Sequence, residues 1–138
     1  MASIGERTAK CCCGNLTATA RGEPAQVYAC SCRECQRGSG SVFSYGAIYP
    51  EEAVTVAGNS TLYSRRSDAG RLVESWFCPV CGVTVYFRAE AAPGMVGIPA
   101  GCFADPDFPK PKKLFFASRR HHWLELGEDI LLEETQPG

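Results

Sequence analysis

Apolar and polar residues alternate along most of this 138-residue chain, in short runs that end at turn residues. A period of two is typical of half-buried strands, and few runs are long enough for a helix of three turns. The pattern therefore predicts a β-rich fold. The expected strands cover residues 17–20, 26–30, 41–49, 54–57, 62–65, 71–77, 83–89, 95–99 and 113–118.

The segments between these strands predict how some of them pair. Residues 54–57 and 62–65 are expected to pair across the turn GNST, and the strands that flank CPVCG (78–82) are expected to form a hairpin. Residues 33–40, RECQRGSG, are interpreted as a connection. The segment HHWLELGEDI (121–130) fits either a strand or a short helical turn.

Length and composition favour one domain that comprises residues 1–138, with residues 1–8 and 133–138 frayed at its ends. No apolar run is long enough to cross a bilayer, and the first residues show no export signal, so we expect no membrane partner and a cytoplasmic location. A net charge of −1 argues against a nucleic-acid partner. The oligomeric state is not predicted.

Nine cysteines are too many to be accidental in a reducing compartment, and their odd number fits poorly with a complete set of disulfides. Metal ligation explains them better. The cysteines are also grouped along the chain, at positions 11, 12 and 13, at 30, 32 and 35, at 78 and 81, and at 102.

The sharpest motif is Cys78-Pro-Val-Cys81-Gly82, because a turn of this type directs both sulfurs to one metal. It supplies two ligands, so a closed tetrahedral site needs two more. Cys11 and Cys13 are suitable because residues two apart on an extended segment share a face. We therefore expect a structural zinc held by Cys11, Cys13, Cys78 and Cys81, against the alternative that these are buried or redox cysteines.

Cys30, Cys32 and Cys35 then remain as a set of three thiols. Three protein ligands with an open fourth position are typical of a catalytic zinc, and thiolate ligands favour a further thiol. Three alternatives stay open: Cys102 as a fourth ligand of a second structural zinc, redox-active thiols, or an iron–sulfur site.

Other polar residues carry weaker signals. Arg33 and Arg37 flank the three thiols and are candidates to bind a substrate carboxylate, although solvated surface is the simpler interpretation for each. The remaining pairs of polar residues are interpreted as structural or solvated, and aromatic residues on strands as core. These are His121 and His122, Arg119 and Arg120, and the aromatic residues Phe43, Tyr45, Phe77, Tyr86 and Phe87.

The order C-x-C-G, C-x-C-x-x-C with a small Ser-Gly stretch, and F-C-x-x-C-G resembles the glutathione-dependent formaldehyde-activating family, which also includes centromere protein V. The matching segments are Cys11–Gly14, Cys30–Cys35 with Ser39 and Gly40, and Phe77–Gly82. Cys12 departs from the pattern, since another residue is usual between the first two ligands.

The resemblance implies an all-β, β-tent fold of stacked antiparallel sheets with zinc knuckles and two zinc ions per chain. It assigns the structural zinc to Cys11, Cys13, Cys78 and Cys81, and the catalytic zinc to Cys30, Cys32 and Cys35. The implied activity is that of a carbon–sulfur lyase, which adds a small thiol such as glutathione to formaldehyde or a related aldehyde. The alternatives are a zinc-stabilised binding module and a thiol redox protein.

Overall fold

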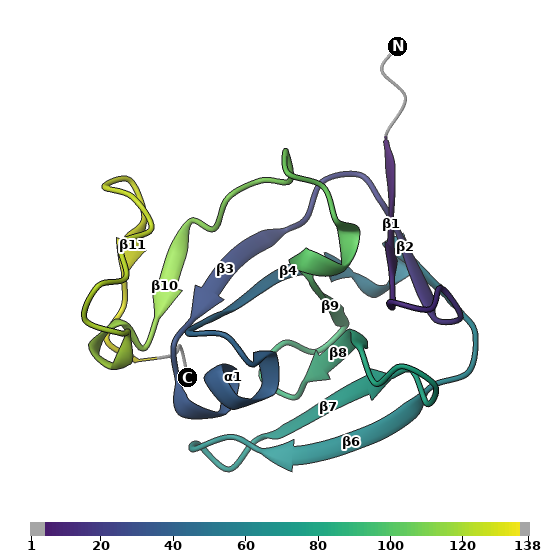
Figure 1. The fold of residues 1–138 in the computed structure, drawn as a ribbon, viewed down its shortest axis with the longest axis horizontal. Helices are drawn as coiled ribbons and strands as arrows, with labels where there is room; N and C mark the ends of the chain where they lie inside the picture. The colour runs from purple at the N-terminus through teal and green to yellow at the C-terminus, as the bar shows by residue number, and fades with distance from the viewer. Residues whose placement is uncertain (1–4, 136–138) are drawn as a thin grey trace.

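A computed structural model describes residues 5–135 as two β-sheets and one short α-helix (Figure 1). The three-stranded sheet has the order β1-β2-β5, and the eight-stranded sheet has the order β11-β10-β3-β4-β9-β8-β7-β6. The strands are β1 (Glu6–Lys10), β2 (Thr17–Arg21), β3 (Gln26–Cys30), β4 (Ser44–Pro50), β5 (Val54–Ala57), β6 (Thr61–Arg66), β7 (Leu72–Phe77), β8 (Thr84–Ala89), β9 (Met95–Pro99), β10 (Lys113–Phe115) and β11 (Leu131–Leu132). The helix is α1 (Arg33–Ser39), and the single 3₁₀ turns are η1 (Glu51–Ala53), η2 (Ala100–Phe103) and η3 (Ala117–Arg119).

The predicted all-β class is confirmed, and most neighbouring strands are antiparallel. Strand β3 pairs along its whole length with residues 44–48 of β4. Strand β7 pairs with β8 as a hairpin around the turn at residues 78–82, as the sequence predicts. The far end of the long sheet differs from the expectation, because β10 pairs with β3 in parallel and β11 pairs with β10 in parallel. These strands are joined by long connections rather than by tight hairpins.

The predicted pairing of residues 54–57 with 62–65 is wrong. Strand β5 pairs with β2 in the small sheet, whereas β6 pairs with β7 at the edge of the long sheet. The turn between β5 and β6 separates the two sheets at Gly58, whose φ is +100°. A Cβ at this position would lie 1.8 Å from the carbonyl oxygen of Asn15, so only glycine permits this approach.

Two further expectations are corrected. Residues 6–8, which we expected to fray, belong to β1 and pair with β2, while residues 1–4 and 136–138 lie outside the described part of the chain. Residues 33–39, expected to be a connection, form α1. The ambiguous segment 121–130 contains turns and no strand or helix.

The main core lies between the two sheets and next to one cysteine group. Ala9, Leu16, Ala18 and Tyr49 are fully buried there, in a cluster that also contains Cys11 and Cys78. A smaller cluster around Leu114 packs under β10. Within residues 5–135, no helix combines the length and the apolar composition needed to span a membrane.

Candidate metal centres and groove

The first cysteine group joins the two sheets. Cys11 and Cys13 follow β1, Cys78 and Cys81 follow β7, and the four Sγ atoms all lie within 4.8 Å of one another. The Sγ atom of Cys13 lies 3.6 Å from those of Cys11 and Cys78. Tetrahedral Zn–S bonds of about 2.3 Å place sulfurs about 3.8 Å apart, so the four thiols fit a single metal ion of this kind.

Backbone amides around this group favour thiolates. The N–H of Leu16 donates to Cys11 Sγ at 3.2 Å, and the N–H of Val80 donates to Cys78 Sγ at 3.4 Å. The backbone N–H groups of Val83 and then Cys13 lower the pKa of Cys81 to about 6. Donors aimed at sulfur stabilise the ionised form that a metal requires.

The second group lies at the end of β3 and the start of α1. The Sγ atoms of Cys30, Cys32 and Cys35 lie within 4.8 Å of one another, and no other Cys, His, Asp or Glu of residues 5–135 completes the set. Cys30 is fully buried, whereas Cys32 and Cys35 are half-buried. The group therefore offers three sulfur ligands.

The local fold holds these thiols in place. Cys32 is the N-cap of α1, with its Sγ accepting the N–H of Cys35 at 3.3 Å, and Gly40 ends the helix in the left-handed conformation at φ +68°. The side-chain amide of Gln36 donates to the carbonyl of Ser31 at 2.8 Å. Its Oε1 lies 3.0 Å from His121 Nε2, so Gln36 also connects α1 to the segment that contains His121.

The thiols of the second group also act on each other. Hydrogen bonds from the Cys30 and Cys35 thiols lower the pKa of Cys32, while the hydrogen bond to Cys32 is the largest cause that raises the pKa of Cys30. Cys32, the N-cap of α1, is therefore the thiol of this group whose ionised form its neighbours favour.

A groove of about 1340 Å³ runs past the half-buried thiols of this group. One wall is α1, and the opposite wall is the β6–β7 hairpin, which Figure 1 shows below the helix. Tyr28 and Phe87 line the groove, and each ring lies over a glycine of a neighbouring strand, Gly46 and Gly97 respectively. These rings give the groove an apolar floor beside the thiols.

Burial is the largest cause that raises the pKa of Tyr28, followed by the charges of Cys35 and Cys30. This places the Tyr28 ring close to the three thiols, as its position two residues before Cys30 on the same strand face requires. Tyr28 could not be selected from the sequence, because an aromatic residue on a strand is usually core.

The two predicted substrate arginines are exposed on α1. Arg37 forms an ion pair with Glu34 at 2.9 Å, and Arg33 also lines the groove. Arg119, interpreted as solvated, pairs with Asp68 at 3.5 Å and stacks over Phe116. The groove also contains Arg65 of β6, which lies far from the cysteines along the chain and carries no local signal in the sequence.

The two unassigned cysteines do not belong to either group. Cys12 is exposed between two members of the first group. Cys102 donates its thiol proton to the carbonyl of Thr84 at 3.3 Å, and burial raises its pKa to about 11. Cys102 is therefore not a fourth member of the three-thiol group, contrary to that alternative.

The fold and these thiol groups define a small β protein with a four-cysteine site and a three-cysteine site, each with the donor set of a metal centre. The chain matches the family model "Glutathione-dependent formaldehyde-activating enzyme" over residues 6–119, and it belongs to that family.

Named relatives agree with this assignment, and a solved structure shares the fold. A protein of Fusarium vanettenii is 33% identical over 89 residues, which are 64% of this chain and 47% of that protein. One of Penicillium rubens is 30% identical over 86 residues, covering 62% and 44%. Both bear the name "Putative glutathione-dependent formaldehyde-activating enzyme", and the chain spans under half of their length. A crystal structure of a Rhodobacter sphaeroides protein shares the fold, with a TM-score of 0.55 at 22% identity over 69% of this chain and 85% of that one.

Proposed function

We propose that this chain is a zinc-dependent carbon–sulfur lyase, which joins a thiol such as glutathione to formaldehyde or a related small aldehyde. The observation that carries the proposal is the three-thiol group beside a large groove, with no fourth ligand from residues 5–135. Family membership supports glutathione and formaldehyde as the substrates to test first.

The proposal includes two zinc ions. Cys11, Cys13, Cys78 and Cys81 would hold a structural ion, and Cys30, Cys32 and Cys35 would hold the catalytic one. The catalytic ion would supply a Lewis acid that stabilises the substrate thiol as a thiolate. In addition, we propose that residues 1–138 act as one domain, while a cytoplasmic location stays a prediction.

The chain itself positions the two reactants. In the reaction the thiol sulfur bonds to the carbonyl carbon, the carbonyl π electrons move to oxygen, and the proton lost by the thiol is balanced by one gained at that oxygen. Tyr28 and Phe87 form an apolar surface that limits water at the reacting atoms. Thiol addition to formaldehyde is facile, so orientation is the main contribution that the groove has to make.

The experiment is an exchange NMR measurement of S-hydroxymethylglutathione formation from glutathione and formaldehyde, with and without the zinc-loaded protein. We expect the exchange rate to exceed the uncatalysed rate in proportion to protein concentration. The variant Cys32→Ser should reduce the increment by at least tenfold, and Cys12→Ser, which removes an exposed groove thiol outside both thiol groups, should not. An exchange rate that is independent of protein would contradict the lyase proposal and favour a binding module.

A further inference from the structure

The groove collects positive charge on a protein that is slightly acidic overall. Its lining includes six cationic side chains, Lys10, Arg33, Arg37, Arg65, Arg71 and Arg119, and two acidic ones, Glu34 and Asp68. The whole chain has a net charge of −1. A cleft with cations along its walls raises the local concentration of anions, so the groove favours a negatively charged ligand.

Ion pairs already occupy some of these cations. Arg37 forms an ion pair with Glu34, and Arg119 forms one with Asp68. Among the groove cations that form no ion pair within residues 5–135, Lys10, Arg33 and Arg71 are exposed to solvent. Arg65 is the half-buried one, where an ionic contact is screened least.

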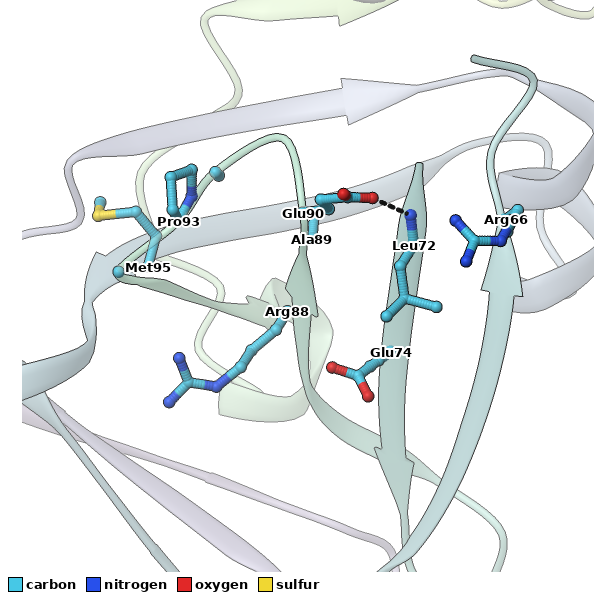
Figure 2. A pocket seen from close by; sticks show the side chains of 10 residues that line it. Arg66, Leu72, Glu74, Arg88, Ala89, Glu90, Pro93 and Met95 are labelled. Atoms are coloured by element: carbon cyan, nitrogen blue, oxygen red, sulfur yellow. Dashed lines mark hydrogen bonds between the residues drawn. The ribbon is translucent and has the colours of Figure 1, made fainter. Parts of the chain in front are cut away.

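The position of Arg65 on β6 directs it into the groove. Successive side chains of a strand point to opposite faces of a sheet. Tyr63 and Arg65 line the groove together with Val73 and Ser75 of β7. Arg66 instead lines a separate hollow of about 330 Å³ with Glu74 and Glu90 (Figure 2), so Arg65 and Arg66 face opposite sides of the hairpin.

Arg65 also lies across the groove from the three-thiol group. It lines the same groove as Cys32 and Tyr28, which belong to the opposite wall and the floor. A thiol substrate with its sulfur at Cys32 would therefore extend its remaining atoms toward Arg65. A guanidinium is the side chain best suited to bind a carboxylate, through two parallel hydrogen bonds.

We propose that Arg65 is the residue that selects thiols carrying a carboxylate, and that Arg33 and Arg37 on α1 are not. This inference rests on the proposed function, because it assumes that a substrate sulfur reaches the three-thiol group. Arg65 would act by binding the substrate and not by taking part in proton transfer. It specifies the substrate class as a small anionic thiol.

The test compares two thiols that differ in one group, 3-mercaptopropionate and its neutral analogue 3-mercaptopropionamide. Each is titrated into the cobalt(II)-substituted protein, and its dissociation constant is read from the change in the cobalt absorption bands. We expect the wild type to prefer the carboxylate by about ten- to a hundredfold, which corresponds to one charge-assisted interaction. In Arg65→Met the preference should fall to near one, with binding of the amide unchanged.

The neighbouring residue provides a matched control. Arg66→Met removes an equal charge one position away on the opposite face, and it should retain the wild-type preference. Arg37→Met should also retain it, because Glu34 already pairs with Arg37. A preference that survives in Arg65→Met, or one that disappears in Arg37→Met or Arg66→Met, would overturn the inference.

A second ligand separates failure of this inference from failure of the lyase proposal. S-methylglutathione keeps both carboxylates but cannot offer a thiolate to a metal. If neither thiol changes the cobalt spectrum, the proposed function fails. Calorimetry then measures the binding of S-methylglutathione to the wild type and to Arg65→Met, which tests the role of Arg65 separately. Binding to the wild type that weakens at least tenfold in Arg65→Met supports the anionic-ligand role, and equal binding or no binding refutes it.

Discussion

Replacing one cysteine with serine should unfold the domain when the cysteine belongs to the four-thiol group. The same replacement in the three-thiol group should remove one metal ion and leave the domain folded. Cys78→Ser removes a fully buried member of the four-thiol group, and Cys32→Ser removes a half-buried member of the three-thiol group. We expect Cys78→Ser to unfold the domain and Cys32→Ser to leave it folded. The difference follows from which parts of the chain each group joins.

The four-thiol group closes a long loop, since Cys13 and Cys78 are separated by 65 residues. Cys13 follows β1 of the three-stranded sheet, and Cys78 follows β7 of the eight-stranded sheet. Structural zinc sites of this kind contribute about 10–16 kcal/mol to folding, as much as the whole stability of about 5–15 kcal/mol of a typical domain. Loss of one buried ligand should therefore leave no stable fold at 25 °C.

The three-thiol group spans only residues 30 to 35, so a metal bound there closes a short loop. Because closure entropy varies with the logarithm of loop length, this difference alone favours the long loop by roughly 2 kcal/mol. Cys32 is also the N-cap of α1, a position worth about 1 kcal/mol. Serine is a preferred N-cap residue, so Cys32→Ser should lower the Tm by less than about 10 °C.

The assay combines circular dichroism melting curves with metal analysis of the purified variants. The wild type should contain two zinc ions per chain, Cys32→Ser one, and Cys12→Ser two with an unchanged Tm, since Cys12 belongs to neither group. If Cys32→Ser unfolded at the same temperature as Cys78→Ser, or if Cys78→Ser melted like the wild type, the assignment of one structural and one catalytic site would be wrong.

Three further predictions concern individual positions. Gly58→Ala would place a Cβ 1.8 Å from the Asn15 carbonyl oxygen at a positive φ. It should lower the free energy of unfolding, measured by urea denaturation, by several kcal/mol, of which about 1–2 kcal/mol come from the φ angle alone. Gly46→Ala would place a Cβ 2.9 Å from the Tyr28 ring and push that ring into the groove. This variant should lower the free energy of unfolding by about 1–3 kcal/mol and weaken thiol binding to the cobalt protein. If both values were unchanged, the Tyr28 ring would not pack on Gly46 as described. Burial raises the pKa of the Cys102 thiol to about 11, so this thiol should react slowly with iodoacetamide at pH 8 and faster as the pH rises toward 11. Peptide mapping of the labelled protein measures this rate, and rapid labelling at pH 8 would refute the burial of Cys102.

Short-range patterns in the sequence predicted the elements whose formation depends on near neighbours. Strand β3 was predicted at residues 26–30 because its alternation is regular, and the β7–β8 hairpin because a C-x-x-C-G turn joins two apolar runs. The same spacing arguments brought together both thiol groups. Helix α1 was missed because Gly38 and Ser39 are poor helix formers, and its formation depends on the Cys32 cap and on the contact of Gln36 with Ser31.

Long-range contacts account for the other differences. The segment GNST resembles a hairpin turn, but the contact between Gly58 and Asn15 sends β5 to one sheet and β6 to the other. Arg65 could not be selected from its neighbours in sequence, because alternation along β6 shows that Arg65 and Arg66 face opposite sides without showing which side is the groove. Only the packing of the hairpin opposite α1 decides this.

Short-range patterns thus account for the metal ligands, and long-range contacts account for the groove wall that selects the substrate. The three thiols lie within six consecutive residues, so their ligand geometry depends mainly on one strand end and one short helix. The groove wall that faces them comes from β6 and β7, which lie more than 25 residues further along the chain. Substitutions in that hairpin can therefore change which thiol is accepted while the ligand set stays intact. For this reason Arg65, and not a residue adjacent to the cysteines, is the position at which we expect substrate preference to be changed without loss of metal.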